Sequence, residues 1–498
     1  MSKRSVDAVA SSQTRGTSVC IATSTATAKR WPAVLSVLKE KHPRGHTLIY
    51  DSAECLEDGL IPELRKLLPQ YLVIVAHPSE ADKKFVRDAH SAACCIDPTH
   101  PFMDVLWGIV TGHDEASAQT MAAEDSPLQI RHVVSGSVQG VDLDAFESGV
   151  AFDELVQGAG QRKIRGVTSQ EVAVDEDATF QIVQAIEDPD VDMLITSGHA
   201  RETEWDIGFL FRGGQIRAGP DGILRAVPVC LYEDGKSRKI NAAGKSKVYS
   251  AAGNCLMAHI NADKQYPEAA INCMALSWMH SAGVRQMTGY TSSTCFGYAG
   301  WGVHRYLWAN VGALTFAEAF FANQQALRLR LQHVEHAWQM RMQQAQGCGE
   351  PVSAQDLALL HELRGLEHER ETTVLYGDPV WEARMLPARA SGDYYTIELR
   401  HVGEGSHRGA QSFEVIVKTL RPGCWTPQVA DDKSTLPARP PFLLHHRGFW
   451  WADGLTGGSR TALVSAELVA TRLFVMVPLE GAFEAGEVTV RRFEAYLH

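Results

Sequence analysis

Two side chains with the chemistry of a thiol hydrolase follow similar apolar segments. His199 comes directly after "DMLITSG", and Cys255 comes directly after "KVYSAAGN", 56 residues further along the chain. A cysteine attacks as its thiolate, and a free thiol has a pKa near 8.5, so it needs a base close by. We therefore predict that His199 is the general base or acid for a nucleophilic Cys255.

The two side chains can meet only if the elements before them end at one edge of the same sheet. Both preceding segments are short, apolar and bounded by small residues, which is typical of buried strands. Strand-like and helix-like runs alternate over 17–135 and again over 178–293, and this pattern predicts an α/β fold with a parallel sheet. Ligands of such sheets bind at the carboxyl ends of the strands, where we expect His199 and Cys255.

The same positions predict an oxyanion hole built from the main chain. The N–H groups of Cys255 and Ala200 would both face the carbonyl oxygen of a bound substrate, and each such donor is worth about 2.7–4 kcal/mol in a transition state. We also expect Cys255 to open a helix, whose N-terminus favours a thiolate. His259 would then lie one turn further along that helix as an ordinary helix histidine, with a weak metal-ligand spacing.

Other residues near the pair have open interpretations. Cys295 also follows a strand-like run and is a rival nucleophile. Glu202, Glu204 and Asp206 follow His199 and would select a basic P1 side chain or orient the histidine, or else form a solvated acidic loop. Trp301, with Phe296 and Tyr298, would line a substrate pocket or form a packed aromatic cluster.

Patterns along the whole chain predict its division into four regions. A polar, glycine-rich stretch over 136–176 suggests a linker or excursion between two α/β halves. Residues 315–346 have the pattern of one long helix, and Thr315 and Glu318 fit a capping box at its start. Short alternating runs after 388 predict an all-β sandwich. The expected regions are a disordered leader (1–15), an N-terminal α/β subdomain (16–150), a catalytic α/β subdomain (151–387) and a β-sandwich module (388–498).

Composition excludes several classes of function. The net charge of −12 and the lack of a basic stripe argue against nucleic-acid binding. No apolar run approaches the 18 residues that a membrane span needs. The ten cysteines form no C-x-x-C pair, which argues against a zinc ribbon. Several lie inside apolar runs, as free cysteines packed in a core do, which favours a reducing compartment. We expect a cytoplasmic protein without metal or cofactor, and composition leaves its oligomeric state open.

Five segments together resemble the gingipain-type cysteine peptidases, which belong to the clan of caspases, legumains and separases. They are "ITSGHARETEWDIGF", "VYSAAGNCLMAHI", "VRQMTGYTSSTCFGYAGWG", "VLYGDPVWEARM" and, upstream, "DPTHPFMDVLWGIVTG". A histidine some 50 residues before the cysteine also matches the caspase arrangement. The resemblance implies a caspase-like, flavodoxin-like parallel sheet with helices on both faces, a closing β-sandwich, Cys255 as nucleophile and His199 as its partner. Asn254 and Ala200 depart from the residues usual there, and the signal peptide of the secreted gingipains is not evident.

The sequence thus predicts a cysteine endopeptidase that cleaves proteins or peptides through a thioester. One alternative is a non-catalytic pseudo-peptidase that binds peptides or protein partners in the same groove. Another is a thiol amidase acting on small molecules. The sequence gives neither the P1 preference nor the natural substrate, and the polar segments "SGSVQG" and "QGAGQRKIRG" are candidate sites for an activating cleavage.

Overall fold

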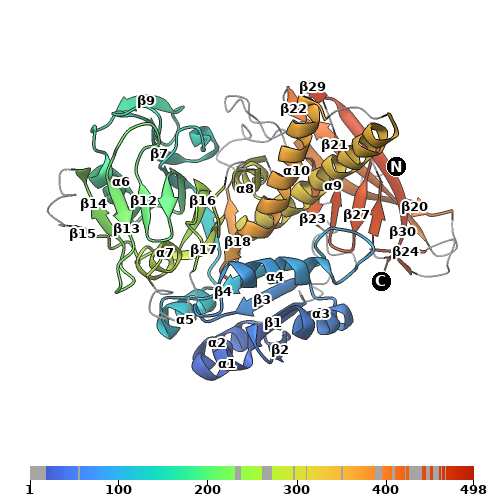
Figure 1. The fold of residues 1–498 in the computed structure, drawn as a ribbon, viewed down its shortest axis with the longest axis horizontal. Coiled ribbons are helices and arrows are strands. Elements are labelled where there is room, and N and C mark those ends of the chain that lie inside the picture. Colours follow the sequence, from blue (N-terminus) through green and yellow to red (C-terminus); the bar gives the residue numbers. More distant parts are fainter. Residues whose placement is uncertain are drawn as a thin grey trace, which may run out of the picture.

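A large mixed sheet with helices on both faces forms the centre of the molecule, and smaller antiparallel sheets lie around it (Figure 1). The computed structural model describes residues 18–53, 56–229, 237–260, 272–294, 298–309, 311–348, 352–386, 395–406, 410–420, 422–425, 440–444, 449–452, 459–460, 462–465, 467–479 and 481–497. The α/β class expected from the sequence is confirmed. The expected leader over 1–15 lies outside the described residues.

The central sheet has twelve strands within the described residues. In spatial order they are β2 (His46–Tyr50), β1 (Val19–Ser24), β3 (Tyr71–Val75), β4 (Leu106–Val110), β18 (Thr373–Tyr376), β17 (Val284–Tyr290), β16 (Lys247–Asn254), β10 (Met193–Gly198), β6 (His132–Ser135), β7 (Ser148–Phe152), β8 (Ala159–Lys163) and β9 (Gln170–Ala173). β1, β3 and β4 are buried along their whole length. Such strands are apolar without alternation because helices cover both faces of the sheet.

Two parallel halves meet in the middle of this sheet. β2, β1, β3, β4 and β18 run in one direction, and β17, β16, β10, β6 and β7 run in the other, because β17 and β18 pair antiparallel. The carboxyl ends of β10 and β16 therefore lie at the opposite edge of the sheet from the carboxyl end of β4. Figure 1 shows the first half below and the second half at the left.

The helices follow the expected pattern in the N-terminal half and in the long helical pair. They are α1 (Thr25–Arg30), α2 (Pro32–Lys41), α3 (Leu56–Leu67), α4 (Lys83–Cys94), α5 (Glu115–Ala123), α6 (Thr179–Glu187), α7 (Met274–Ser281), α8 (Tyr298–Ala309), α9 (Phe316–Cys348) and α10 (Ala354–Thr372). The capping box before α9 is confirmed, since the Thr315 N–H donates to Glu318 Oε2 (2.7 Å) and the Glu318 N–H donates to Thr315 Oγ1 (3.1 Å). None of the helices in the described ranges has an apolar stretch long enough to cross a bilayer.

Two expectations about local structure were wrong. The stretch 136–176 is neither a linker nor an excursion between two halves, because β7, β8 and β9 lie in it and extend the central sheet beyond β6. Its glycines fit a strand as well as a loop where backbones approach closely: a Cβ on Gly160 would lie 2.7 Å from the Ala151 carbonyl oxygen. The strand-like run "AVPVCLY" (226–232) lies in the region 178–293, where the alternating pattern predicted a parallel sheet. Its described part does not join the central sheet, since β14 (Arg225–Val227) belongs to a separate antiparallel sheet; residues 230–236 lie outside the described residues.

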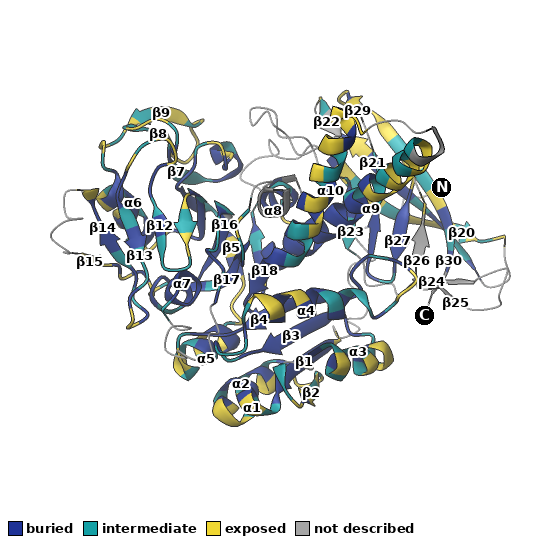
Figure 2. Cartoon of the chain, in the orientation of Figure 1, coloured by how far each residue is buried: buried dark blue, intermediate teal, exposed yellow. Residues whose placement is uncertain are grey.

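The region after residue 388 is antiparallel, as expected. One sheet contains β20 (Tyr395–Glu404), β21 (Gln411–Thr419), β30 (Val488–Leu497), β24 (Phe449–Ala452) and β25 (Ser459–Arg460), and another contains β23 (Phe442–Leu444), β28 (Phe474–Met476), β27 (Val469–Thr471) and β26 (Ala462–Val464). Phe413 and Phe493 of the first sheet share an apolar cluster with Val475 of the second. Figure 2 shows β27 coloured as buried along its length.

Candidate active site

The predicted pair lies at the ends of two neighbouring strands, β10 and β16. Gly198 pairs with Asn254 in parallel register, so the next residues, His199 and Cys255, leave the sheet at the same level. The register shifts by one residue between the Ile195–Ser250 and Ser197–Gly253 pairs. β16 thus carries one extra residue, and without this bulge Cys255 would lie one position out of step with His199.

Asn254 joins the ends of the two strands through its buried side chain. Its Nδ2 donates to the Gly198 carbonyl oxygen (3.1 Å), and its Oδ1 accepts a hydrogen bond from Thr196 Oγ1. The Thr196 hydroxyl also lies 2.7 Å from the Tyr249 hydroxyl. Asn254 is fully buried, and these bonds fix the main chain immediately before both His199 and Cys255.

Cys255 lies in a turn after β16, and the expected helix N-terminus at this position was wrong. Residues 255–258 form a turn, and the next helix in the described part of the chain, α7, begins at Met274. Leu256 has a φ of +57°, a conformation that a residue with a branched apolar side chain rarely adopts. The Leu256 N–H donates to the Ser292 carbonyl oxygen (3.1 Å), which fastens the strained turn to the loop after β17. Cys255 therefore does not stand at the N-terminus of a helix of its own.

The same loop contacts the sulfur of Cys255. The Thr294 N–H donates to Cys255 Sγ (3.3 Å), and the thiol lies 3.7 Å from the Thr294 carbonyl oxygen. Thr294 Oγ1 in turn donates to Glu369 Oε1 (3.0 Å) of α10. An N–H directed at the sulfur stabilises negative charge on it. The loop therefore supplies a favourable partner for the sulfur, although no helix begins at Cys255.

His199 is exposed at the carboxyl end of β10. Gly198 has a φ of +117°, a left-handed conformation that favours glycine, and turns the chain out of the sheet. The His199 ring stacks on Phe209, with 4.7 Å between ring centroids. Among the described residues, no hydrogen bond joins this ring to Cys255, whose thiol is turned toward Thr294.

The N–H of Ala200 is not used by the hairpin that follows His199, and its role as an oxyanion donor stays a prediction. β11 (Ala200–Arg201) pairs antiparallel with β12 (Glu204–Asp206), with Ala200 opposite Trp205. The Asp206 N–H donates to the His199 carbonyl oxygen (2.8 Å), which makes that the hydrogen-bonded pair. Hydrogen-bonded and non-bonded pairs alternate in an antiparallel ladder, so the Ala200 N–H points away from β12.

Of the acidic residues predicted after His199, Glu202 lies in the turn between β11 and β12, and Glu204 and Asp206 lie in β12. These strands belong to a small five-stranded sheet made of β11, β12, β13 (Gln215–Arg217), β14 and β15 (Arg238–Lys239). Glu204 lies 3.8 Å from Arg201 Nη1 and 3.7 Å from Arg217 Nε, and Asp206 accepts a hydrogen bond from Gln215 Nε2. Both carboxylates therefore already have polar partners in this structure, and a role in selecting a basic P1 side chain stays a prediction.

Trp205, between these two acidic residues, points the other way and is buried. Its Nε1 donates to the Ser197 carbonyl oxygen (3.0 Å), and its ring lies where a Cβ on Gly136 would come within 2.7 Å. This contact holds the small sheet against the end of β10, and so fixes the loop that carries His199.

Three other predicted residues have different outcomes. His259 is not on a helix: it follows the 255–258 turn, where burial lowers its pKa despite the charge of Glu202. Trp301 lies in α8, but its side chain is outside the description, as are Cys295 and Phe296. Their roles as pocket wall or rival nucleophile stay predictions.

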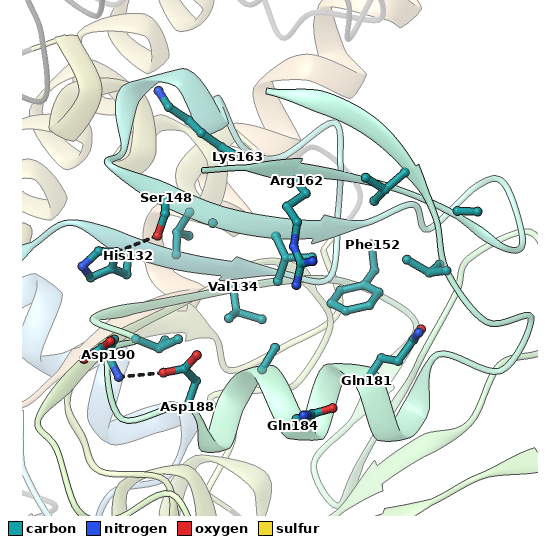
Figure 3. Close-up of a pocket in the computed structure, with 18 residues that line it drawn as sticks. His132, Val134, Ser148, Phe152, Arg162, Lys163, Gln181, Gln184, Asp188 and Asp190 are labelled. Carbon is teal, nitrogen blue, oxygen red and sulfur yellow. Dashed lines mark hydrogen bonds between the residues drawn. The ribbon is translucent and has the colours of Figure 1, made fainter. Parts of the chain in front are cut away.

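A cavity of about 470 Å³ lies elsewhere, between strands β6–β9 and helix α6 (Figure 3). Its lining includes Arg162 and Lys163 on one side and Asp188 and Asp190 on the other, and Lys163 points away from the hollow. His132 and Ser148, at its margin, are joined by a hydrogen bond of 2.7 Å. The cavity contains none of the predicted site residues, so it does not define the substrate groove.

Comparison with known proteins gives little support for any particular family. No protein-family profile matches the sequence, and no curated protein matches it. A solved structure described as "Structure of Protease" aligns with 96% of this chain and 97% of its own chain, at a TM-score of 0.40 and 8% sequence identity. A likeness at that level decides neither the fold family nor the activity.

Sequence reasoning missed Asn254, Thr196 and Thr294 as supports of the site. Asn254 stood out only as an unusual neighbour of the cysteine, and its partner Thr196 lies in the middle of an apolar strand. A buried polar residue inside a strand is itself a signal, because its hydrogen bonds must be met nearby. Thr294 gave no such signal, since its contact with the sulfur depends on how the loop after β17 folds back.

Proposed function

We propose that this protein is a cysteine endopeptidase of the caspase-like type, with Cys255 as nucleophile and His199 as general base and acid. The observation that carries the proposal is the register of β10 and β16, which sets the two residues level at adjoining strand ends. Two hydrogen bonds support it: the one from Asn254 to the Gly198 carbonyl oxygen and the one from the Thr294 N–H to the Cys255 sulfur. Two residues without a joint function would need neither bond.

The proposed reaction begins with a change in the thiol's orientation. Cys255 Sγ turns from the Thr294 carbonyl toward His199, which takes its proton, and the thiolate attacks the peptide carbonyl carbon. The N–H groups of Cys255 and Ala200 hold the resulting oxyanion. His199 then gives the proton to the leaving amine, and water hydrolyses the thioester with His199 as base.

The exposed position of His199 suits a substrate that is a protein or an extended peptide. The ring stands outside the sheet edge beside Phe209 rather than at the bottom of an enclosed cavity. A small-molecule amidase needs a closed pocket around the bond that it cleaves. We propose peptides or proteins as substrates in a cytoplasmic, reducing compartment that keeps the thiol free.

The test compares the full chain with Cys255→Ala, His199→Gln and a control, Cys95→Ala, which removes a partly buried cysteine elsewhere. Each protein is incubated with a mixed peptide library under reducing conditions, and cleavage products are read by mass spectrometry. We expect Cys255→Ala to lower kcat/KM by at least about 10⁴-fold, and Cys95→Ala to leave it unchanged. Equal cleavage by the parent and Cys255→Ala would contradict the proposal.

A pseudo-peptidase is the second candidate, and one observation favours it. The thiol faces Thr294 and makes no hydrogen bond with His199 among the described residues. Alkylation distinguishes the two functions: a paired thiol reacts with iodoacetamide faster than an ordinary cysteine at pH 7, and His199→Gln removes that advantage. A Cys255 that reacts at the same slow rate in both proteins, together with no peptide cleavage, would favour the binding protein.

A further inference from the structure

Two histidines and an aspartate meet at the opposite edge of the central sheet from Cys255. His113 and Asp114 follow β4 at its carboxyl end, and His280 lies in the last turn of α7. One potential ligand atom from each of the three side chains lies within 4.8 Å of the other two. The two imidazole rings are 5.0 Å apart between centroids and inclined by 36°.

The hydrogen bonds of His113 leave one ring nitrogen without a partner. Its Nε2 lies 3.4 Å from the Pro220 carbonyl oxygen, which can only accept, so Nε2 carries the proton. In a neutral imidazole the other nitrogen, Nδ1, is then an acceptor. His113 Nδ1 is buried and has no hydrogen-bond partner among the described residues. A carbonyl on one nitrogen and a free lone pair on the other is the usual arrangement of a metal-binding histidine.

One carboxylate oxygen of Asp114, Oδ2, takes no part in the cap of helix α5. The carboxylate is the N-cap of α5, and both the Ser117 N–H and the Ser117 hydroxyl donate to Oδ1, each at 2.7 Å. The hydrogen bonds that described residues make to this side chain all go to Oδ1. Oδ2 is therefore available as a ligand without loss of the helix cap.

The turn between β13 and β14 closes over the two rings. Gly222 has a φ of +71°, and a Cβ there would lie 2.7 Å from Cγ and Cδ2 of His113 and 2.9 Å from Cδ2 of His280. Only glycine lets the turn come so close. Asp221 in the same turn acts electrostatically on His280 and is itself held by Arg225 (2.8 Å) and Lys239 (3.1 Å).

We propose that His113, His280 and Asp114 bind a divalent transition-metal ion of the zinc class, with water in the remaining position. Two imidazoles and a carboxylate suit zinc and similar ions better than calcium or magnesium, which prefer oxygen ligands. Ligand atoms around tetrahedral zinc lie about 3.3–3.5 Å apart, given bonds of about 2.0–2.1 Å. The present spread of up to 4.8 Å would close by small rotations of the side chains.

Such an ion would join two parts of the chain that are distant in sequence. It would tie the end of β4 to α7, the helix that leads into β17, beneath the β13–β14 turn. Because the site lies at the other edge of the sheet from Cys255, its role is to hold the two halves together rather than to act on substrate.

The test measures binding of zinc chloride, without any assay of activity. The full chain carries Cys255→Ala and His199→Ala, so that the proposed catalytic pair cannot hold the ion, and is stripped with a chelator. We expect one high-affinity zinc per chain by calorimetry, visible d–d absorption when cobalt(II) replaces zinc, and a thermal unfolding midpoint that rises with zinc concentration. Calcium should give none of these effects.

Three further variants locate the site. Asp114→Asn keeps the helix cap but removes the charged ligand, and His280→Gln removes one imidazole; each should weaken zinc binding by at least about tenfold. His46→Gln, which removes an exposed histidine of β2, is the control and should bind as the parent does. Unchanged affinity in Asp114→Asn and His280→Gln, or no saturable binding in the parent, would overturn the proposal. If His280→Gln does not fold, the capped Asp114→Asn variant alone decides.

Discussion

At the scale of single residues, Asn254 determines how well His199 and Cys255 are aligned. Its amide bridges Gly198 and Thr196 in a fully buried position, so the two strand ends move together. One of the two residues that depart from the expected pattern is therefore the one that supports the pair. A small residue there would leave the alignment to the bulge in β16 alone.

We predict that Asn254→Ala lowers kcat by about 10–100-fold with little change in KM, because misplacing reacting groups by an ångström costs on that order. Its loss also leaves the Gly198 carbonyl without that donor, at a cost of about 1–3 kcal/mol in the free energy of unfolding. Peptide cleavage kinetics and urea unfolding measure the two effects. Thr196→Val, which keeps the Asn254–Gly198 bond, is the control and should retain more of kcat. Equal losses of kcat in both variants would show that Asn254 acts only through general stability.

The residue types were enough to suggest His199 and Cys255, because each directly follows an apolar segment that ends in small residues. Ala200 was suggested because it comes directly after His199. The sequence could not show the bulge, since an extra residue in one strand is visible only against its partner. Nor could it show that Thr294 faces the sulfur. That contact depends on a loop 39 residues further along the chain that returns to the same edge.

At the scale of elements, the turn after β18, Gly377-Asp378-Pro379, contacts the C-terminal end of α2. The Gly377 N–H donates to the Ile109 carbonyl oxygen (2.8 Å), and Asp378 is buried against Lys41 (2.8 Å) and His42 Nε2 (3.0 Å). Burial alone would raise the pKa of the Asp378 carboxyl, but the hydrogen bond from His42 and the charge of Lys41 outweigh it and hold the pKa below its ordinary value. The turn is thus a charged anchor between parts of the chain more than 300 residues apart.

We predict that Asp378→Asn lowers the free energy of unfolding by about 3–5 kcal/mol at pH 7, because it removes the negative charge that faces the partly buried Lys41 and the buried His42. A lowered folded-state pKa gives stability that is present above the unfolded value of about 3.9 and is lost as pH falls through the folded value. The difference between parent and variant should therefore shrink below about pH 4. Urea unfolding across pH 3–8 measures it, with Asp51→Asn at an exposed site as the control. A gap that stays constant down to pH 3 would show that the carboxylate's charge is not its source.

Most element types could be predicted, but their arrangement could not. Periodicity showed the strands of the N-terminal half and the 315–346 helix, because these segments are long and strongly patterned. It did not show that β17 and β18 run antiparallel and join two parallel halves, since strand order is set by tertiary packing. The polar strands β8 and β9 resembled a linker because they lie at the solvent-exposed end of the sheet, where few residues need to be apolar.

At the scale of the whole molecule, the C-terminal β region shares part of its apolar core with the central sheet. Phe474 of β28 packs with Phe442 (5.1 Å between centroids), Phe321 of α9 (5.9 Å) and Phe102 (5.9 Å), and all four belong to the same apolar core as the central sheet. Arg472 also donates to the carbonyl oxygens of Pro69 (3.0 Å) and Asp104 (2.9 Å). The sequence pattern changes near residue 388 from alternating strands and helices to short alternating strand-like runs. The shared apolar core nevertheless joins the regions on either side of that boundary.

We predict that the chain unfolds in one cooperative transition and that Phe474→Ala lowers its free energy of unfolding by about 3–5 kcal/mol, the usual cost of deleting a buried aromatic ring. The loss should move the whole transition, because the ring touches helix α9 and the loop before β4 as well as its own sheet. Urea unfolding followed by both circular dichroism and tryptophan fluorescence measures it, since coincident curves indicate a single transition. Val488→Ala, at an exposed position of β30, is the control and should change the free energy by no more than about 0.5 kcal/mol. Two separated transitions, with Phe474→Ala shifting only one of them, would show instead that the β region folds apart from the sheet that carries His199 and Cys255.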